Sequence, residues 1–309
     1  MRNNDKVALV TDILDFMVHD GYGLRLSIFF KGCPLRCRWC QNPEAIEGEI
    51  EIAYDAKRCI GCGKCLEICP VPGAIVEDNR RRIDRTKCTK CLKCVGGCSG
   101  TALQQVGKAY SVGELYAKIS RYRVFFDSSD RGGVTLSGGE PTYQKAFVVA
   151  LLRKCKETGI HTTIDTCGYA QYETIREIAE NVDLVLYDIK HMDEAKHIEG
   201  TGVSNKLILD NLKRLCVEGD FDIAVRIPLI PAYNDDEENV RKTAEFLKRT
   251  SKIDKLDLLP FNELPADKYQ AMGLNWDCGE LKSQTRQDLF KLKEIVEGYG
   301  FKVTIGGMW

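Results

Sequence analysis

Three cysteines near the start of the chain have the spacing of ligands to an iron–sulfur cluster that keeps one iron open. They are Cys33, Cys37 and Cys40, in the order Cys-x-x-x-Cys-x-x-Cys, and the next cysteine in the sequence is Cys59. Three thiolates on a cubane leave one iron without a protein ligand. An open coordination position lets a metal bind a substrate rather than only carry electrons. This cysteine loop (residues 33–40) therefore predicts redox chemistry on a molecule that binds at the open iron.

Eight further cysteines form two copies of a ferredoxin-type run. The first copy is Cys59, Cys62, Cys65 and Cys69, and the second is Cys88, Cys91, Cys94 and Cys98. This spacing holds a 4Fe-4S cluster in bacterial ferredoxins, where the fourth cysteine of each run ligates the other cluster. We therefore expect each cluster to take three ligands from one copy and one from the other. The expected sets are Cys59, Cys62, Cys65 and Cys98, and Cys88, Cys91, Cys94 and Cys69.

Zinc is the alternative for these eight cysteines, because eight thiolates can hold two tetrahedral zinc ions. The duplicated threefold spacing favours cubane clusters. The second copy departs from the ferredoxin pattern at one position, since Ser99 stands where Pro70 follows the first copy. Basic residues within 80–93 would stabilise a reduced cluster or attract an acidic electron donor; the alternative is a solvated basic surface.

The composition predicts a cytoplasmic protein. The chain has 309 residues, of which 44% are hydrophobic, and a formal net charge of −1. That composition supports a sizeable core and gives no overall field for nucleic acid or membranes. No apolar run has the ~20 residues of a membrane span, and residues 1–5 lack signal-peptide character. Clustered cysteines in such a chain more often hold metal than form disulfides. Four scattered cysteines are expected to be ordinary buried thiols: Cys155, Cys167, Cys216 and Cys278.

The motifs must be positioned by a regular framework, and the sequence predicts an α/β fold. A strand is expected over residues 25–31, directly before the cysteine loop. Further strands are expected at 133–137, 161–165, 184–190, 223–228, 256–260 and 302–305. Helices are expected at 144–157, 172–180, 237–250 and 282–298. Strands that alternate with helices imply parallel βαβ units. We therefore expect a full or partial α/β barrel at 1–50 and 108–309, interrupted by a cysteine-rich module (residues 51–107).

Glycines and charged residues follow the predicted strands at one end. Gly138, Gly139 and Glu140 come after the strand at 133–137, and Asp165 and Asp188 end the next two strands. In parallel α/β folds chemistry gathers at the carboxyl ends of the strands. Each residue alone could be a turn, a helix cap or a surface charge. Together with the cysteine loop they predict one site. The four histidines form no triad with a nucleophile, so hydrolysis has no support.

These motifs together resemble the radical S-adenosylmethionine (SAM) superfamily, and within it the activating enzymes of glycyl radical enzymes. The resemblance rests on residues 32–44, 133–141, 165–168 and 187–190 and spans nearly the whole chain. It implies a partial (β/α) TIM-like barrel of the radical SAM type with an inserted ferredoxin-like domain. The implied cofactors are three 4Fe-4S clusters and SAM, with a monovalent cation near Asp165 and Asp188.

By the same resemblance, the amine and carboxylate of SAM chelate the open iron. Residues 138–140 would hold the amine, Trp39 would pack near the adenine, and Arg226 would contact the cofactor or the incoming peptide. The full set implied to bind SAM is Trp39, Asn42, Gly138, Gly139, Glu140, Asp165, Asp188, Lys190 and Arg226. Asn262 stands where some relatives have a histidine, so this position is left out of the predicted site.

The implied activity is that of an oxidoreductase. A flavodoxin or ferredoxin reduces the open cluster, SAM yields a 5′-deoxyadenosyl radical, and the radical takes a hydrogen atom from a glycine in the C-terminal loop of a partner glycyl radical enzyme. No protein acid or base is assigned. The alternatives are a radical SAM enzyme acting on a small molecule or RNA, and an iron–sulfur electron-transfer protein. Near-neutral charge disfavours RNA, and an electron carrier has no use for an open iron.

Overall fold

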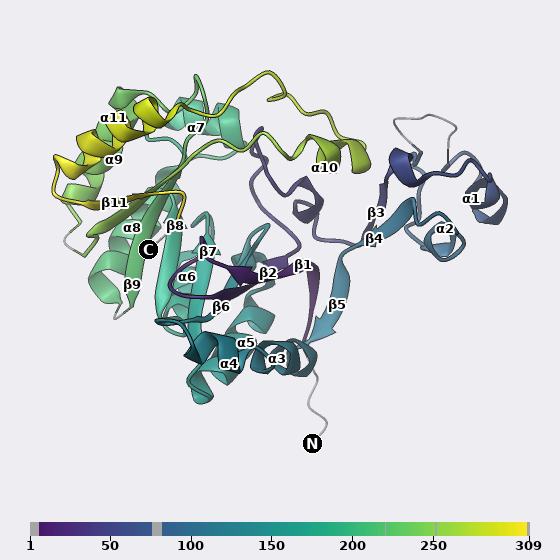
Figure 1. The fold of residues 1–309 in the computed structure, drawn as a ribbon, viewed down its shortest axis with the longest axis horizontal. Helices are drawn as coiled ribbons and strands as arrows, with labels where there is room; N and C mark the ends of the chain where they lie inside the picture. Colours follow the sequence, from purple (N-terminus) through teal and green to yellow (C-terminus); the bar gives the residue numbers. More distant parts are fainter. Residues whose placement is uncertain (1–5, 76–81, 220, 251, 308–309) are drawn as a thin grey trace.

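The computed structural model describes residues 6–75, 82–219, 221–250 and 252–307, and its main element is one nine-stranded sheet. The strand order is β11-β10-β9-β8-β7-β6-β2-β1-β5 (Figure 1). The strands are β1 (Val7–Met17), β2 (Arg25–Phe30), β5 (Lys108–Ser111), β6 (Gly133–Gly138), β7 (His161–Thr166), β8 (Leu184–Asp188), β9 (Asp222–Pro228), β10 (Lys255–Leu259) and β11 (Lys302–Ile305). The seven strands from β2 to β11 run parallel, and β1 and β5 add an antiparallel edge. The expected mixed α/β fold with a parallel sheet is confirmed.

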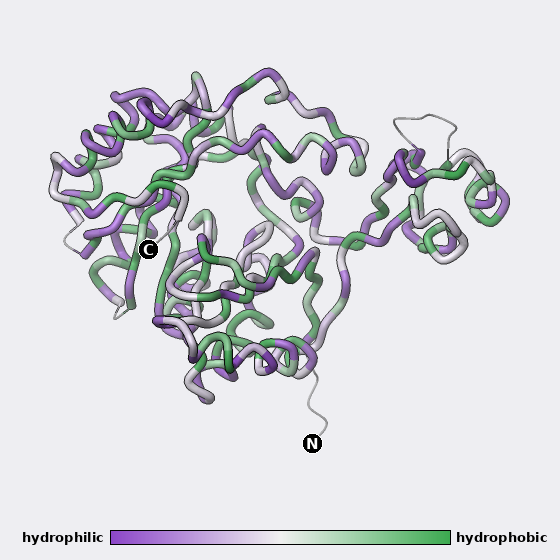
Figure 2. Tube along the Cα trace, viewed as in Figure 1, coloured by the Kyte–Doolittle hydropathy of each residue, from purple (hydrophilic) through white to green (hydrophobic). Residues whose placement is uncertain are grey.

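Seven helices in the described ranges pack along the outer side of this curved sheet. They are α3 (Val112–Ser120), α4 (Arg123–Asp127), α5 (Lys145–Glu157), α6 (Tyr172–Ala179), α8 (Lys206–Glu218), α9 (Glu237–Lys248) and α11 (Arg286–Glu297). The apolar faces of these seven helices and the strands form one continuous core, visible as the hydrophobic stretches along the strands in Figure 2. Two others lie elsewhere: α7 (Glu194–Thr201) lies against the cysteine loop, and α10 (Ala266–Ala271) contacts the segment after that loop and strand β3 (Glu51–Tyr54) of the cysteine-rich module. None of the described helices is both long enough and apolar enough to cross a membrane.

The predicted strands and helices are present; most of their boundaries agree to within two residues, and two differences bear on the site or on the helix signals. The strand expected at 184–190 ends at Asp188, so Lys190 lies in the following segment. The helix expected from residue 282 begins at Arg286, because Thr285 caps it and exchanges hydrogen bonds with Asp288. Such a capping box fixes a helix start more firmly than apolar spacing does. The prediction of a helix start at residue 282 was therefore wrong by one turn.

The cysteine-rich module projects from the sheet on a small antiparallel pair of strands (Figure 1). Its elements are β3 (Glu51–Tyr54), β4 (Leu103–Val106), α1 (Lys64–Ile68), α2 (Lys93–Gly96) and the short 3-10 helix η2 (Ala56–Arg58). The module has a core of its own, which includes Ile52, Tyr54, Ile75 and Leu103, and six of its eight cysteines lie in this core or pack against it. The expectations for residues 1–5, Arg80 and Arg81 fall outside the described ranges.

Arg25 holds the amino-terminal ends of the central strands together. It is 1% exposed and donates to the hydroxyls of Thr135 (3.0 Å) and Thr163 (2.8 Å) and to the carbonyl of Val134. Its Nη1 also lies 3.1 Å from Nδ1 of His161. Burial, together with the charge of Arg25, lowers the pKa of His161 to about 4.

We expect the protein to lose stability as the pH falls below about 6.5. His161 takes up a proton on unfolding, because its pKa is about 6.5 in an unfolded chain and lower in the folded one. The free energy of unfolding should drop by about 1 kcal/mol between pH 7.5 and 5, a value reduced to allow for partial exposure of the ring. Denaturant titrations at both pH values measure the drop. In His161→Gln, whose amide oxygen can still accept from Arg25, the drop should shrink by that amount; an unchanged drop would assign it to other groups.

Candidate functional site

A cavity of about 510 Å³ opens at the carboxyl ends of the parallel strands. The sequence motifs converge on it from five neighbouring segments: the cysteine loop after β2 and the ends of β6, β7, β8 and β9. The predicted residues that line it are Cys33, Cys37, Trp39, Cys40, Asn42, Gly138, Gly139, Asp165, Asp188, Lys190 and Arg226. Because parallel strands all end on the same side, residues up to 193 positions apart in the sequence meet here.

The cysteine loop is anchored by its backbone. The amide of Cys33 donates to the carbonyl of Ile46 (2.9 Å), and the amide of Arg38 donates to the carbonyl of Gly200 in α7 (3.0 Å). Leu35 is 1% exposed and fixes the middle of the loop. Burial raises the pKa of Cys37 to about 12 and that of Cys40 to about 11, so a metal that binds these thiols must displace their protons.

Two glycines let the end of β6 approach this loop. Gly138 has φ +115°, and a Cβ there would lie 2.2 Å from the amide nitrogen of Phe30. A Cβ at Gly139 would lie 2.5 Å from the carbonyl oxygens of both Gly32 and Ala45. These contacts are with backbone atoms, which cannot turn aside as a side chain can. Glycine is therefore required at both positions for the observed packing.

Glu140 does not line the cavity, although its two glycine neighbours do. Its side chain is fully buried, and both oxygens accept hydrogen bonds from the protein. Oε1 accepts from the amide of Thr142 (3.0 Å) and the hydroxyl of Thr166 (2.8 Å), and Oε2 accepts from the amide of Cys167 (2.8 Å). The Glu140 side chain thus holds the turn after β7. The contact with the SAM amine that the resemblance implies for residues 138–140 stays a prediction.

Four charged residues alternate along the cavity floor. Asp165 lies 3.4 Å from Arg226 and accepts from Ser137 (2.9 Å), and Lys190 donates to Asp188 (2.7 Å). Burial raises the pKa of Asp165 to about 6, while the charge of Arg226 lowers it. Burial also opposes the charge on Lys190, but Asp188 and Cys37 raise the Lys190 pKa above its ordinary value. The floor can therefore bind a ligand that carries both an amine and a carboxylate.

Three residues in or beside the cavity were not among the predicted site residues. Asp257 pairs in register with Arg226, is fully buried, and has one carboxylate oxygen without a hydrogen-bond partner. Cys167 is buried, as expected, but its thiol lies beside the Cys33 sulfur and lowers the Cys33 pKa by hydrogen bonding. Asn262, which was left out, lines the cavity and donates to Gln41 (3.2 Å). Because Asn262 follows the carboxyl end of the parallel strand β10, its position in the sequence could have placed it among the predicted site residues.

An aromatic group closes the side of the cavity next to the cysteine loop. The ring of Trp39 lies 4.6 Å from that of Tyr233, and Trp39 is only 6% exposed. Phe261 lines the cavity and stacks on Trp276 at a centroid distance of 6.3 Å. This wall offers an apolar surface to a flat ring.

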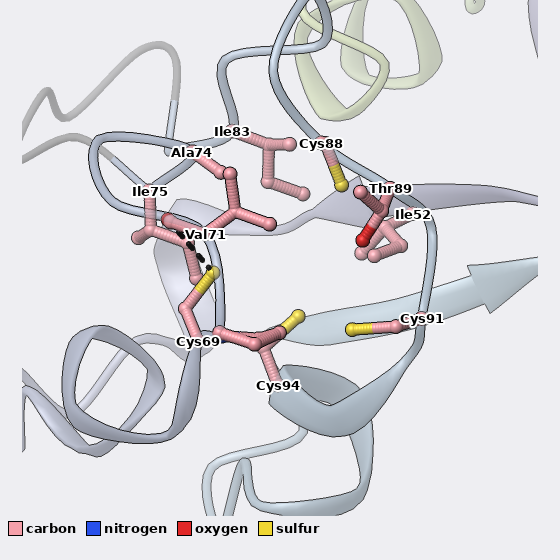
Figure 3. Close-up of a pocket in the computed structure, with 11 residues that line it drawn as sticks. Ile52, Cys69, Val71, Ala74, Ile75, Ile83, Cys88, Thr89, Cys91 and Cys94 are labelled. Carbon is pink, nitrogen blue, oxygen red and sulfur yellow. Dashed lines mark hydrogen bonds between the residues drawn. The ribbon is translucent and has the colours of Figure 1, made fainter.

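The module cysteines gather around two smaller cavities, which we name by their position on β3. The inner cavity borders Ile52 and contains Cys69, Cys88, Cys91 and Cys94, whose side chains surround one space in Figure 3. The outer cavity borders Tyr54 and contains Cys59, Cys62, Cys65 and Cys98. In each cavity three cysteines come from one run and the fourth comes from the other run.

Comparison with known proteins places these features in a family context. Residues 27–246 match the model of the radical SAM superfamily. The trans-4-hydroxy-L-proline dehydratase activating enzyme of Clostridioides difficile is 41% identical, over 97% of this chain and 99% of the relative. The choline trimethylamine-lyase activating enzyme of Oleidesulfovibrio alaskensis is 37% identical, over 97% and 98%. The isethionate sulfite-lyase activating enzyme of Nitratidesulfovibrio vulgaris is 39% identical, over 89% and 90%.

A solved structure supports the fold. The crystal structure of SuiB from Streptococcus suis bound to the precursor peptide SuiA has a TM-score of 0.55 to this chain. It covers 92% of this chain and 48% of SuiB at 16% identity, so the similarity concerns the fold alone.

Proposed function

Since the chain belongs to the radical SAM superfamily and to its activating enzymes of glycyl radical enzymes, we propose that its main cavity binds SAM at an open 4Fe-4S cluster. The observation that carries the proposal is the convergence of the cysteine loop with Gly138, Gly139, Asp188 and Lys190 on one cavity. The proposed ligands of the cluster are Cys33, Cys37 and Cys40.

The residues present fit these groups. Three thiols line one wall of the cavity, and a charged floor lies within the same space. Within the described ranges no three histidine, cysteine or acidic side chains converge tightly enough to hold a single metal ion. Thiols that stand apart around a space suit a cluster of several irons better than a zinc ion.

The protein's own residues would bind and orient SAM. The backbone at Gly138 and Gly139 is bare enough for close approach of the methionyl group, and Asp188 and Lys190 complement its amine and carboxylate. Trp39 and Phe261 would shield the adenine from water. When bound, the cluster and SAM supply the electron and the 5′-deoxyadenosyl group that together remove a hydrogen atom from the partner's glycine. Arg226 and Lys190 already pair with Asp165 and Asp188, so a monovalent cation would have to compete with them.

The module would hold two further 4Fe-4S clusters, one in each of its cavities, within a ferredoxin-like domain inserted in a partial barrel. Support comes from the crossed arrangement of the cysteines, which is that of two-cluster ferredoxins. These clusters would accept electrons from a flavodoxin or ferredoxin.

Exchanging Cys69 for alanine should remove the inner cluster and spare the outer one, although Cys69 belongs to the first run. The crossed ligand set predicts this result, because Cys69 lines the inner cavity with the second run. Cys98→Ala should have the opposite effect. Mössbauer and EPR spectra of anaerobically reconstituted protein measure both losses. If Cys69→Ala and Cys65→Ala remove the same cluster, the crossed assignment is wrong.

The activity is tested with a glycyl radical enzyme labelled with deuterated glycine. Three probes are choline trimethylamine-lyase, trans-4-hydroxy-L-proline dehydratase and isethionate sulfite-lyase. Incubation with SAM and dithionite should give 5′-deoxyadenosine that carries one deuterium, and a glycyl radical signal on at least one probe. A probe whose radical glycine is replaced by alanine serves as the control. Absence of 5′-deoxyadenosine would refute the SAM proposal; unlabelled product with every probe would favour a small-molecule substrate.

A further inference from the structure

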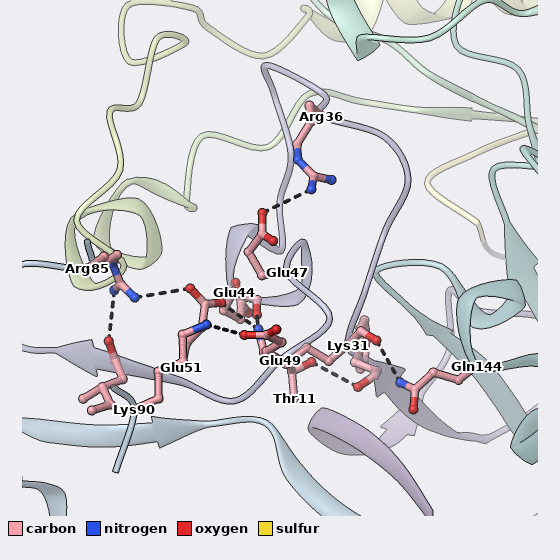
Figure 4. A network of polar contacts seen from close by, with 12 residues as sticks. Thr11, Lys31, Arg36, Glu44, Glu47, Glu49, Glu51, Arg85, Lys90 and Gln144 are labelled. Atoms are coloured by element: carbon pink, nitrogen blue, oxygen red, sulfur yellow. Dashed lines mark hydrogen bonds and ion pairs between the residues drawn. The ribbon is translucent and has the colours of Figure 1, made fainter. Parts of the chain in front are cut away.

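A group of three charged side chains, of which two are buried and the third, Arg85, is 31% exposed, joins the sheet to the cysteine-rich module. Lys31 directly follows β2, Glu51 begins β3, and Arg85 precedes the second cysteine run. The Lys31 ammonium donates to Glu51 Oε2 at 2.7 Å, and Arg85 Nη1 donates to Glu51 Oε1 at 3.2 Å. Figure 4 shows Glu51 between the two cations. Each carboxylate oxygen of Glu51 therefore faces a different part of the molecule.

On the sheet side, Lys31 is fixed at every polar atom. Its side chain is fully buried, and its ammonium also donates to the carbonyl of Glu44 at 2.7 Å. Its backbone amide donates to Leu9 (2.9 Å), and its carbonyl accepts from Gln144 (2.8 Å). A Cβ at Gly107 would lie 2.8 Å from the Lys31 side chain, so the chain leaving the module passes directly over it. Lys31 stands two residues before Cys33, the first cysteine of the loop.

On the module side, Arg85 ties Glu51 to the inner cavity. Its Nη2 donates to the carbonyl of Ile52 at 2.9 Å, and the Ile52 side chain lines the inner cavity. Arg85 stands three residues before Cys88, which also lines this cavity. The outer cavity borders Tyr54, two residues further along β3. The inner cavity is therefore the one that the charged group connects to the cysteine loop.

We propose that Lys31, Glu51 and Arg85 are positioning residues that fix the inner cluster relative to the open cluster, so that electrons reach the open cluster from the inner one. The inference rests on the proposed function, because it assumes a cluster in each cavity. A buried carboxylate that is bonded to two cations holds them in one geometry, because moving either cation away would leave an unpaired buried charge. Such a joint resists rotation of the module in a way that exposed ion pairs do not.

The test compares Glu51→Gln with a matched exposed pair at the same connection. Glu49 is 76% exposed at its side chain and pairs with Lys90 at 2.6 Å, so Glu49→Gln is the control. Both full-length variants are reconstituted anaerobically, checked for unchanged iron content, and reduced with dithionite. The readout is the magnetic interaction between the inner cluster and the open cluster, measured as a splitting or broadening of the EPR signal of the open cluster. That signal is identified by its change on addition of SAM. We expect this interaction to be lost in Glu51→Gln and kept in Glu49→Gln.

Two further variants separate positioning from stability. Arg85→Met leaves the Lys31–Glu51 pair in place and should still weaken the interaction. The double variant Lys31→Met/Glu51→Met replaces buried charges with apolar side chains, an exchange that often preserves stability, and should lose the interaction while folded. In both, SAM cleavage driven by reduced flavodoxin should fall, while cleavage driven by dithionite persists. An unchanged interaction in Arg85→Met and in the double variant would overturn the proposal.

The readout also distinguishes this inference from the proposed function. The magnetic interaction needs neither SAM cleavage nor a partner enzyme. Amide hydrogen exchange at residues 46–51 and 106–108, the two segments that connect the module to the sheet, reports on the rigidity of this connection without any cluster signal. This exchange should be faster in Glu51→Gln than in Glu49→Gln. A wild-type protein with interacting clusters but no 5′-deoxyadenosine would refute the proposed function alone.

Discussion

Replacing Cys37 by alanine should abolish cleavage of SAM and leave in place the two clusters that we propose for the cysteine-rich module. Two thiolates cannot hold the open cluster firmly, whereas the module has its own eight cysteines in two separate cavities. Iron content should fall from about twelve to about eight atoms per chain, as expected for the loss of one of three 4Fe-4S clusters. Iron analysis and 5′-deoxyadenosine release under dithionite measure the two effects.

The control for this experiment is a cysteine that belongs to none of the three groups. Cys216 is 8% exposed and packs in the main core, so Cys216→Ala should keep both the iron and the activity. If Cys37→Ala still forms 5′-deoxyadenosine, the cysteine loop is not the site of SAM cleavage. If it loses all its iron, the three groups are not independent sites.

Gly139→Ala should lower the rate of SAM cleavage by about 100-fold or more, since a displacement near 1 Å at a reacting centre can have that effect. The added methyl would lie 2.5 Å from two carbonyl oxygens that hold the start of the cysteine loop, so the loop or the end of β6 must shift. The shift would displace the thiolates relative to the cavity floor. Turnover assays at saturating SAM, with binding measured separately, check the prediction.

A glycine in a helix provides the comparison for Gly139. Gly113 lies in the first turn of α3, and the nearest atom to an added Cβ there is 4.0 Å away. Gly113→Ala should leave activity unchanged and stabilise the protein slightly, because alanine favours the helix. Equal activity of Gly139→Ala and wild type would show that the cysteine loop and the end of β6 can move apart without a loss of SAM cleavage.

The features that the sequence predicted correctly depend on local spacing. Strands with apolar runs and helices with 3.6-residue periodicity appear where expected, because burial on this sheet follows those periods. Gly138 and Gly139 could be placed at the site because the carboxyl ends of parallel strands share one side. The antiparallel strands β1, β3, β4 and β5 were missed. The exposure of β1 does not alternate regularly along its length, because β1 lies between β2 and β5 and β5 pairs with only its first four residues.

The contacts that were not predicted depend on residues that meet only after folding. Glu140 bonds to Thr166 and Cys167, 26 and 27 positions away, and no local pattern marks that partnership. Lys31 and Glu51 are separated by 20 positions, and Glu51 and Arg85 by 34. Charged residues usually indicate a surface, so only the packing of the module against the sheet shows that Lys31 and Glu51 are buried.

The antiparallel pairing of β3 with β4 has an evolutionary consequence. Glu51 lies opposite Val106, so the chain enters and leaves the module at neighbouring points. A segment attached in this way can be gained or deleted without disturbing the order of strands in the main sheet. Deletion of the segment would remove Glu51 and leave the buried charge of Lys31 without its carboxylate partner. In relatives that lack the segment, we therefore expect an uncharged residue at the position of Lys31.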